Sequence, residues 1–218
     1  MRIEKLEPSK HVAERWLCWL EDGSCIRVTE SEVVSFALYT GMEIPDTLYD
    51  QLTEAARRST IRTKALDYIS ARPMSRRELE DKLTARRPKG RDGRERPPLA
   101  TSEEAGEVAD WLEELGYLND AEYAKTVARH YSAKGYGERR LRDEFFRRGV
   151  PRQYWEEALS EAQEPEEGID AFLQKRFRGG APDQRELKRA SDALARRGYR
   201  WEEIREGLNR YGANIQEE

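Results

Sequence analysis

Residues 69–83, ISARPMSRRELEDKL, match residues 131–145, YSAKGYGERRLRDEF, at a constant offset of 62 positions. The two segments share serine, alanine, arginine, leucine and aspartate at corresponding places. Each segment overlaps the end of a stripe of apolar residues spaced four apart, the spacing of one helix face, and the stripe occurs a third time. The stripes comprise Ile61, Ala65 and Ile69; Tyr123, Val127 and Tyr131; and Ile169, Leu173 and Phe177. The pattern predicts three copies of one helical unit.

Each copy is expected to contain a second and a third helix. The second helices follow acceptable N-cap residues, and two of them have the glutamate of a capping box, Glu78 and Glu186. The N-cap residues are Ser75, Gly137 and Asp183, with leucine four positions later at Leu79, Leu141 and Leu187. The third helices carry apolar pairs at Trp111/Leu115, Trp155/Leu159 and Ile204/Leu208. Three helices of about 45 residues bury little by themselves, so we expect stacked copies in an elongated, curved array.

The N-terminal residues favour β-structure. The run RWLCWLEDGSCIRV (15–28) has two apolar segments joined by Asp22-Gly23, a pair preferred in two-residue type I′ turns. The sequence therefore predicts a β-hairpin that turns at these two residues. In that register one face carries Leu17, Trp19, Ile26 and Val28, and the other carries Cys18 and Cys25, which do not face each other directly.

Two helices are expected between the hairpin and the first repeat. Thr29 and Glu32 have the spacing of a capping box at the start of one helix, and Gly41 is expected to end it. Asp46 is expected to cap another helix that runs through Leu48, Leu52 and Ala55 and can continue into the segment from Ile61. The predicted organisation is residues 1–60, a hairpin with helices; 61–118, repeat one with an inserted loop at 88–104; 119–163, repeat two; and 166–212, repeat three.

Charge is abundant and segregated along the chain. Charged residues make up 38% of the sequence, against about 25% in an average globular protein, although the net charge is only −4. Residues 72–96 hold ten Lys/Arg and five Asp/Glu, and residues 134–152 hold seven and three. Residues 103–122 hold eight acidic residues and no Lys/Arg. Attraction to an anionic partner would therefore come from local patches.

Several functional classes lack their sequence signals. The chain has no GxxxxGK[ST], HExxH or CxxC motif, so we predict no enzyme activity, catalytic residue, cofactor or metal site. His11 and His130 are assigned no chemistry, and Cys18 and Cys25 are expected to be free thiols. No apolar run approaches the roughly 18 residues of a membrane span, and the first residues lack the apolar core of a signal peptide. We expect a cytoplasmic protein that does not engage a membrane.

Arginines are the candidate binding residues. The pairs Arg147-Arg148 and Arg196-Arg197 end helices, where cations stabilise terminal carbonyls by ~0.3–1 kcal/mol each, which explains them without a partner. The same dipole disfavours Arg139 and its neighbours at the start of their helix, which points to a partner with carboxylate or phosphate groups. The candidates for contact with a partner or DNA are Arg76, Arg77, Arg86, Arg87, Arg139, Arg140, Arg142, Arg147, Arg148, Arg196 and Arg197.

The run LEELGYLNDAEYAKTVARHYSAKGYGERRLRDEFFRRGVPRQYWEEAL (112–159) resembles the RecX family, regulators of the recombinase RecA. The likeness lies in Gly116-Tyr117-Leu118, Asp120, Tyr123-Ala124, Tyr131, Gly135, Arg139 to Leu141, Arg148-Gly149-Val150 and Leu159, and the N-terminal hairpin and three tandem units also fit longer members. The departures are Asn119, where an acid is frequent, and the 88–104 insertion, which could alter how repeat one meets its partner.

The resemblance implies a monomeric, non-enzymatic modulator. Such a protein binds RecA or the RecA–DNA filament, inhibits ATP hydrolysis and filament extension, and thereby limits recombination, DNA repair and the SOS response to DNA damage. Two alternatives stay open on the residues alone. One is a helical module that binds single- or double-stranded DNA directly, and the other is a helical scaffold for a different protein.

Overall fold

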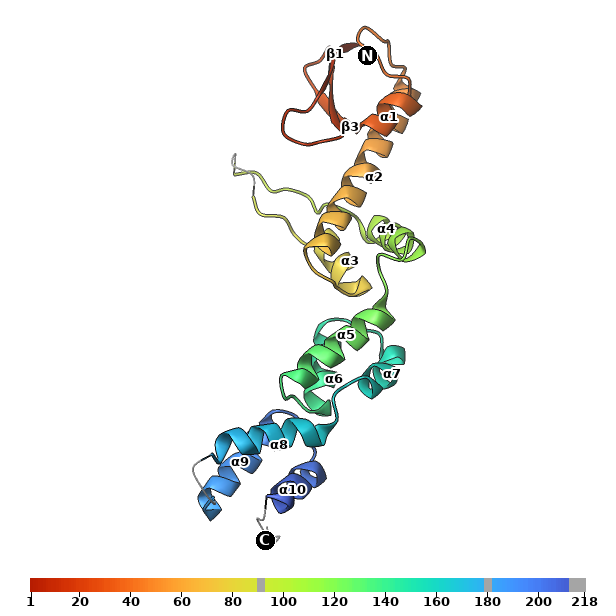
Figure 1. The fold of residues 1–218 in the computed structure, drawn as a ribbon. Helices are drawn as coiled ribbons and strands as arrows, with labels where there is room; N and C mark the ends of the chain where they lie inside the picture. The colour runs from red at the N-terminus through yellow and green to blue at the C-terminus, as the bar shows by residue number, and fades with distance from the viewer. Residues whose placement is uncertain (90–92, 179–181, 212–218) are drawn as a thin grey trace. The chain divides into compact units, whose positions relative to one another are not determined.

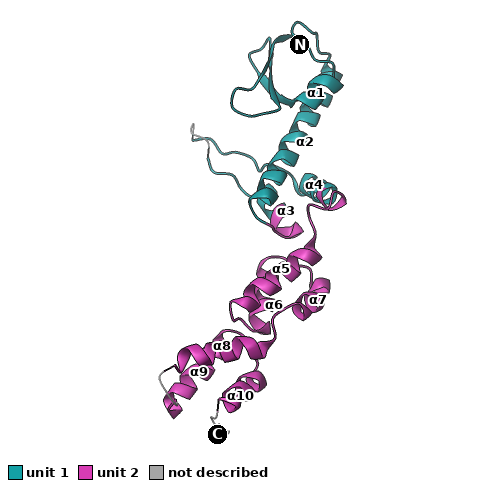
Figure 2. Cartoon of the chain, in the orientation of Figure 1, with its two compact units in different colours: residues 1–72, 80–111 teal, residues 73–79, 112–218 magenta. Residues whose placement is uncertain are grey.

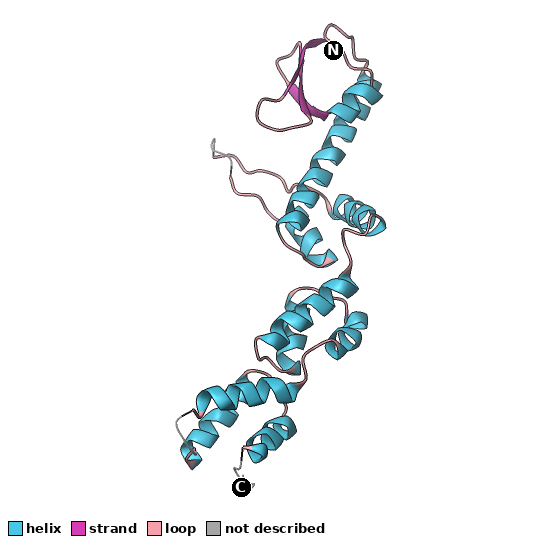
Figure 3. Ribbon diagram, viewed as in Figure 1, coloured by secondary structure: helices cyan, strands magenta, loops and turns pink. Residues whose placement is uncertain are grey.

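The computed structural model describes residues 1–89, 93–178 and 182–211 (Figure 1). Helices dominate, and the strands lie at the N-terminal end (Figure 3). The helices are α1 (Glu30–Ser35), α2 (Asp46–Ala71), α3 (Arg76–Thr84), α4 (Ser102–Glu114), α5 (Asp120–Ala133), α6 (Glu138–Arg147), α7 (Trp155–Ser160), α8 (Pro165–Arg176), α9 (Gln184–Arg196) and α10 (Trp201–Arg210). A 3-10 turn, η1 (Arg152–Tyr154), precedes α7. The predicted mainly helical fold with a small N-terminal β-element is confirmed.

The chain forms two compact units (Figure 2). The first comprises residues 1–72 and 80–111, and the second comprises residues 73–79 and 112–218. The predicted division into three repeats stays a prediction, and parts of the expected 88–104 insertion and of the 166–212 repeat lie outside the described residues. Among the described helices, none combines the length and the apolar character that crossing a membrane requires.

The N-terminal sheet is antiparallel, with strand order β1 (Ile3–Pro8), β2 (Arg15–Leu20) and β3 (Cys25–Thr29). The β2–β3 hairpin is the predicted one, but β1 was not predicted, because its charged residues hide the apolar alternation. Its contribution to the core is nevertheless large, since Ile3 is fully buried opposite Leu20.

The predicted register of the hairpin is wrong by one residue. Trp19 lies opposite Cys25 and Leu17 opposite Arg27. The turn has three residues between Leu20 and Ser24, ending at Gly23 with φ of +79°, the left-handed residue of a three-residue loop. Because side chains alternate between faces, a slip of one residue moves every side chain to the other face.

The two cysteines consequently lie on opposite faces of the sheet. Cys18 packs in the core with Leu20 and Val28, where burial raises the pKa of its thiol to about 11. Cys25 is half-buried on the other face beside Trp19, which is 37% exposed, and both cysteines are free thiols.

The capping box of α1 is confirmed. The backbone N–H of Glu32 donates to the Thr29 hydroxyl (3.3 Å), and the Thr29 N–H donates to the Glu32 carboxylate (2.8 Å). The helix ends at Ser35, however, well before Gly41. The chain turns at Ala37, which has φ of +49°, because the buried Leu38 enters the core of the sheet.

Helix α2 continues through the expected boundary into the segment from Ile61, a continuation that the sequence pattern permits. It runs for 26 residues without interruption, so the expected boundary after residue 60 lies inside it. Asp46 is its first residue and Pro45 its N-cap, which corrects the expected cap. Arg57 of α2 pairs with Glu104 of α4, and this hydrogen bond holds the pKa of the Glu104 carboxyl at about 2.

The predicted apolar stripes and second-helix leucines face the cores. Most residues of the three stripes are buried: Ile61 and Ala65 on α2, Tyr123 and Val127 on α5, and Ile169, Leu173 and Phe177 along and just after α8. The third residues of the first two stripes, Ile69 and Tyr131, are half-buried. Leu79, Leu141 and Leu187 are buried on α3, α6 and α9. One third-helix pair is wrong: α4 ends at Glu114, so Leu115 lies beyond it and is 51% exposed, while Leu112 is buried.

Candidate partner-binding surface

Helix α6 separates an apolar face from a charged face. It begins after Gly137, and its inner face buries Leu141 and Phe145, as the sequence predicts. The Phe145 ring lies 5.7 Å from that of Trp155, between centroids, and anchors α6 to α7. Phe146, by contrast, is 69% exposed. A large aromatic residue in solvent between arginines is unusual for a surface that only needs to be soluble.

The arginines at the start of α6 differ in their contacts. Arg139 is exposed, and no ion pair or side-chain hydrogen bond joins it to another described residue. Arg140 is half-buried and pairs with Glu144 (3.2 Å). Arg142, also half-buried, pairs with Glu138 (2.7 Å) and with Glu156 (3.0 Å). Of these three arginines, Arg139 alone is exposed.

The two arginines at the end of α6 have separate roles. Arg147 is 64% exposed and pairs with Glu144. Arg148 folds back over α5, and its guanidinium donates to the hydroxyls of Tyr123 (2.7 Å) and Tyr131 (3.1 Å). Burial alone would lower the pKa of Arg148, but these two hydrogen bonds outweigh it and raise the pKa above its ordinary value. Arg148 is thus tied to the core.

Glu144 organises the arginines of this surface, and the sequence reasoning missed it. Its side chain is only 1% exposed, and Arg140, Arg147 and Arg148 all pair with it. Burial opposes its ionisation, yet hydrogen bonds from Arg147 and Tyr131 hold the pKa of the carboxyl below its usual range. Its spacing was a signal, because Glu144 shares the helical face of Leu141, Phe145 and Arg148.

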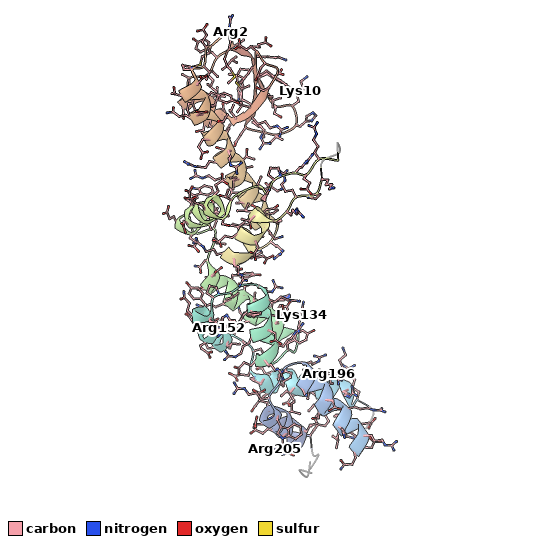
Figure 4. All side chains as sticks on the ribbon, turned by 180° about the vertical axis from the view of Figure 1, so that it is seen from behind. Arg2, Lys10, Lys134, Arg152, Arg196 and Arg205 are labelled. Carbon is pink, nitrogen blue, oxygen red and sulfur yellow. The ribbon has the colours of Figure 1, made fainter. Side chains whose placement is uncertain are left out.

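The arginine pair at the end of α9 repeats this division. Arg196 is exposed (labelled in Figure 4), and no ion pair or side-chain hydrogen bond joins it to the rest of the described chain. Arg197 is half-buried, donates to the Gly135 carbonyl (3.2 Å) and lies 4.9 Å from the centroid of the Phe172 ring. The second arginine of each pair is therefore structural.

The remaining four candidates lie on or next to α3. Arg76 pairs with Glu113 (2.8 Å). Arg77 is exposed, and its aliphatic stem packs against Gly149: a Cβ added to Gly149 would lie 2.8 Å from the Arg77 Cδ. Arg86 and Arg87 are exposed, with Arg86 at 3.9 Å from Glu95. Arg86 and Arg87 belong to the first unit and the other nine candidates to the second.

Of the predicted site residues, the fold brings three to one hollow. Arg139 and Arg140, from the start of α6, line it together with Arg196, from the end of α9. Asp143, Ala195 and Gly198 complete the lining. Within the described residues, no group of three or more His, Cys, Asp or Glu side chains is placed to hold a metal ion. The hollow offers positive charge and hydrogen-bond donors, which suit an anionic partner.

Comparisons with known proteins agree with this architecture. Residues 119–159 match the model of the RecX second three-helix domain, inside the predicted second repeat. The chain is 32% identical over 149 residues to the regulatory protein RecX of Vibrio vulnificus, a match that covers 66% of this chain and 88% of the relative. It is 33% identical over 141 residues to the regulatory protein RecX of Pseudomonas putida, covering 64% and 83%.

The match to the regulatory protein RecX of Streptococcus gordonii covers more of the chain. It is 24% identical over 208 residues and covers 94% of this chain and 75% of the relative. Among solved structures, a crystal structure of regulatory protein RecX has a TM-score of 0.66 at 19% identity and covers 96% of this chain and 98% of its own. That likeness supports the fold, and the sequence matches establish the family. The chain therefore belongs to the RecX family of regulatory proteins.

Proposed function

We propose that this protein is a non-enzymatic regulator that binds the RecA recombinase or its DNA filament, inhibits ATP hydrolysis and limits filament extension. Membership of the RecX family supports this role, because the family resemblance implies regulators of RecA. The observation that carries the proposal is the outer face of α6. It presents Arg139, Phe146 and Arg147 to solvent on a helix whose other face is anchored in the core.

This combination of residue types fits a protein interface. Arginine and aromatic side chains are enriched among residues that dominate binding energy, and they act best on a rigid support. Phe145, fully buried and next to Phe146 in the sequence, supplies that support, and Glu144 holds the surrounding arginines in place. We propose that the exposed candidates contact the partner and that Arg140, Arg142, Arg148 and Arg197 orient the surface.

The test is ATP hydrolysis by RecA on single-stranded DNA, titrated with this protein. The wild-type chain should slow hydrolysis in a concentration-dependent way. The triple variant Arg139→Ala, Phe146→Ala and Arg147→Ala should need at least about tenfold more protein for the same inhibition, since interface hot spots cost about 2 kcal/mol or more.

The matched control removes two exposed arginines of α9 outside this surface. Arg185→Ala with Arg189→Ala should inhibit RecA like wild type. Both side chains belong to α9 rather than α6, are exposed, and have no partner among the described residues. Absence of both inhibition and RecA binding at saturating wild-type protein would reject the proposal. Equal inhibition by wild type and the triple variant would reject this surface as the contact.

A further inference from the structure

A small pocket lies in the second unit, between the start of α6, the link from α7 to α8, and Tyr199. It has a volume of about 150 Å³, comparable to a cavity that holds one benzene-sized molecule. Leu141, Leu159 and Pro165 give it an apolar wall, and Tyr136 and Tyr199 also line it. The pocket is therefore large enough for a small organic ligand and offers it both apolar and polar contacts.

Backbone hydrogen bonds fix one side of this pocket. The Gly137 N–H donates to the Arg197 carbonyl (2.9 Å), and the Arg139 N–H donates to the Gly198 carbonyl (3.1 Å), so the start of α6 and the end of α9 satisfy each other. A Cβ on Gly137 would lie 2.6 Å from the Tyr199 nitrogen, which leaves no room for a side chain at this junction. The main chain therefore holds Tyr199 beside the start of α6.

A buried serine fixes the opposite side. Ser132 of α5 is 5% exposed, and its hydroxyl accepts from the Gln163 N–H (3.0 Å) and donates to the Arg129 carbonyl (3.2 Å). These bonds tie the link between α7 and α8 to α5. Both sides of the pocket are thus held in place by the protein itself, so a ligand would not have to order them.

The hydroxyl of Tyr199 is a buried polar group without a partner. Tyr199 is 7% exposed, burial raises its pKa to about 12, and no hydrogen bond joins its hydroxyl to any residue that the structure describes. A Cβ on Gly168, another lining residue, would collide with this hydroxyl, so the oxygen lies at the pocket wall. Buried tyrosine hydroxyls normally have a partner, which indicates that this one serves a molecule in the pocket.

The charge of the lining indicates which ligand fits. The charged side chains among the described lining residues are two carboxylates, Glu138 and Glu164. Glu138 is compensated by Arg142 (2.7 Å) and by Arg200. Glu164 is exposed, and no ion pair or side-chain hydrogen bond joins it to the rest of the described chain. The lining therefore repels an anion and attracts a cation.

We propose that this pocket binds a small aliphatic amine in its ammonium form. The Tyr199 hydroxyl accepts a hydrogen bond from the ammonium group, Glu164 supplies the opposite charge, and the alkyl chain packs against Leu141 and Leu159. An ammonium group has three donors and no acceptor, which matches a hydroxyl oxygen and a carboxylate. Binding requires neither RecA nor DNA and goes beyond the proposed function.

The experiment is a titration of the whole ¹⁵N-labelled chain with butylammonium chloride at constant ionic strength, followed by ¹H–¹⁵N correlation NMR. The backbone amides of Gly137, Gly168 and Tyr199 should shift and saturate. 1-Butanol has the same chain without the charge and should bind up to about fivefold more weakly, the upper end for one exposed ion pair. Butyrate has the opposite charge and should give no saturable shift.

Substitutions test the two polar contacts separately. Tyr199→Phe should weaken butylammonium binding about twofold to tenfold, the range for one hydrogen bond. Its urea midpoint without ligand should not fall, because the oxygen has no partner among the described residues. Glu164→Gln should weaken binding by up to about fivefold. Glu202→Gln removes an exposed acid of α10 that does not line the pocket and should bind like wild type.

Several results would overturn the proposal. Absence of a saturable shift in the wild type would leave water as the occupant, and equal affinity of wild type and Tyr199→Phe would remove the hydroxyl as a ligand. Butyrate that binds as well as butylammonium would contradict the role of Glu164. Nα-acetyl-lysine amide carries the same ammonium group on a peptide unit, so binding of this compound without binding of butylammonium would assign the pocket to a lysine side chain of a partner. None of these outcomes depends on inhibition of RecA.

Discussion

Helices α6 and α9 end in the same sequence, Arg-Arg-Gly, yet their exposed arginines have different surroundings. Arg147 of α6 pairs with Glu144 one turn earlier, whereas Arg196 of α9 has Ala193 at the corresponding position. The second arginine of each pair is bound to the interior in both helices. An identical motif thus supplies a paired charge in one helix and an available charge in the other, and an acid three residues away makes the difference.

The comparison of α6 with α9 assumes that the buried side chains of α6 determine its stability and that its exposed side chains contribute little to it. Phe145→Ala should therefore lower the free energy of unfolding by ~3–5 kcal/mol, the cost typical of removing a buried aromatic ring. Phe146→Ala, next to it but exposed, should stay within about ±0.5 kcal/mol. Urea midpoints measure both. Similar losses in the two variants would show that the core and the surface are not separable.

The two arginines of the α6 pair should differ in their effect on stability. Arg148→Ala removes hydrogen bonds to two tyrosine hydroxyls and should cost about 1.5–3 kcal/mol, the range for bonds to a charged group. Arg147→Ala removes one of three arginines that pair with Glu144, and because Arg140 and Arg148 remain, the urea midpoint should fall by less than in Arg148→Ala. If Arg147→Ala proved as destabilising as Arg148→Ala, the assignment of one structural and one exposed arginine would be wrong.

A substitution in α9 can reproduce the arrangement of α6. Ala193→Glu places an acid three residues before Arg196, the spacing of Glu144 and Arg147, and should stabilise the helix by only about 0.2–0.5 kcal/mol. The urea midpoint of Ala193→Glu should rise slightly at low salt, and the gain should disappear at high salt because salt screens an exposed ion pair. Ala193→Gln has similar size without the charge and should show no salt-dependent gain. An equal change in both substitutions would exclude ion pairing as the cause.

The helical part of the fold could be predicted because its signals are local. Apolar spacing placed Leu141 and Leu187 in the core, and capping residues placed the starts of α1, α6 and α9. The sheet register could not be predicted in the same way, because Asp22-Gly23 fits turns of two or three residues and each choice exposes a different face. Burial of Cys18 rather than Trp19 depends on contacts with β1 and α2.

The candidate site was predicted in composition but not in geometry. Counting arginines identified Arg139 and Arg196, yet no sequence signal showed that α6 and α9 meet end to end. Nor did the sequence reasoning distinguish Arg139 from Arg142, whose acidic partners lie both four residues before it and on α7. Whether an arginine is free to bind a partner depends on the residues that the fold places beside it, and the sequence alone does not show which residues these are.

The continuity of α2 has a consequence for how the first unit can be divided. At 1.5 Å per residue its 26 residues extend about 39 Å, and one end packs under the sheet through Leu52 while the other carries Ile61 and Ala65. A fragment beginning at residue 61 would start in the middle of this helix and lose the turns that nucleate it. The sheet and the first repeat should therefore melt as one cooperative block, and deletion of the N-terminal residues would compromise the repeat as well.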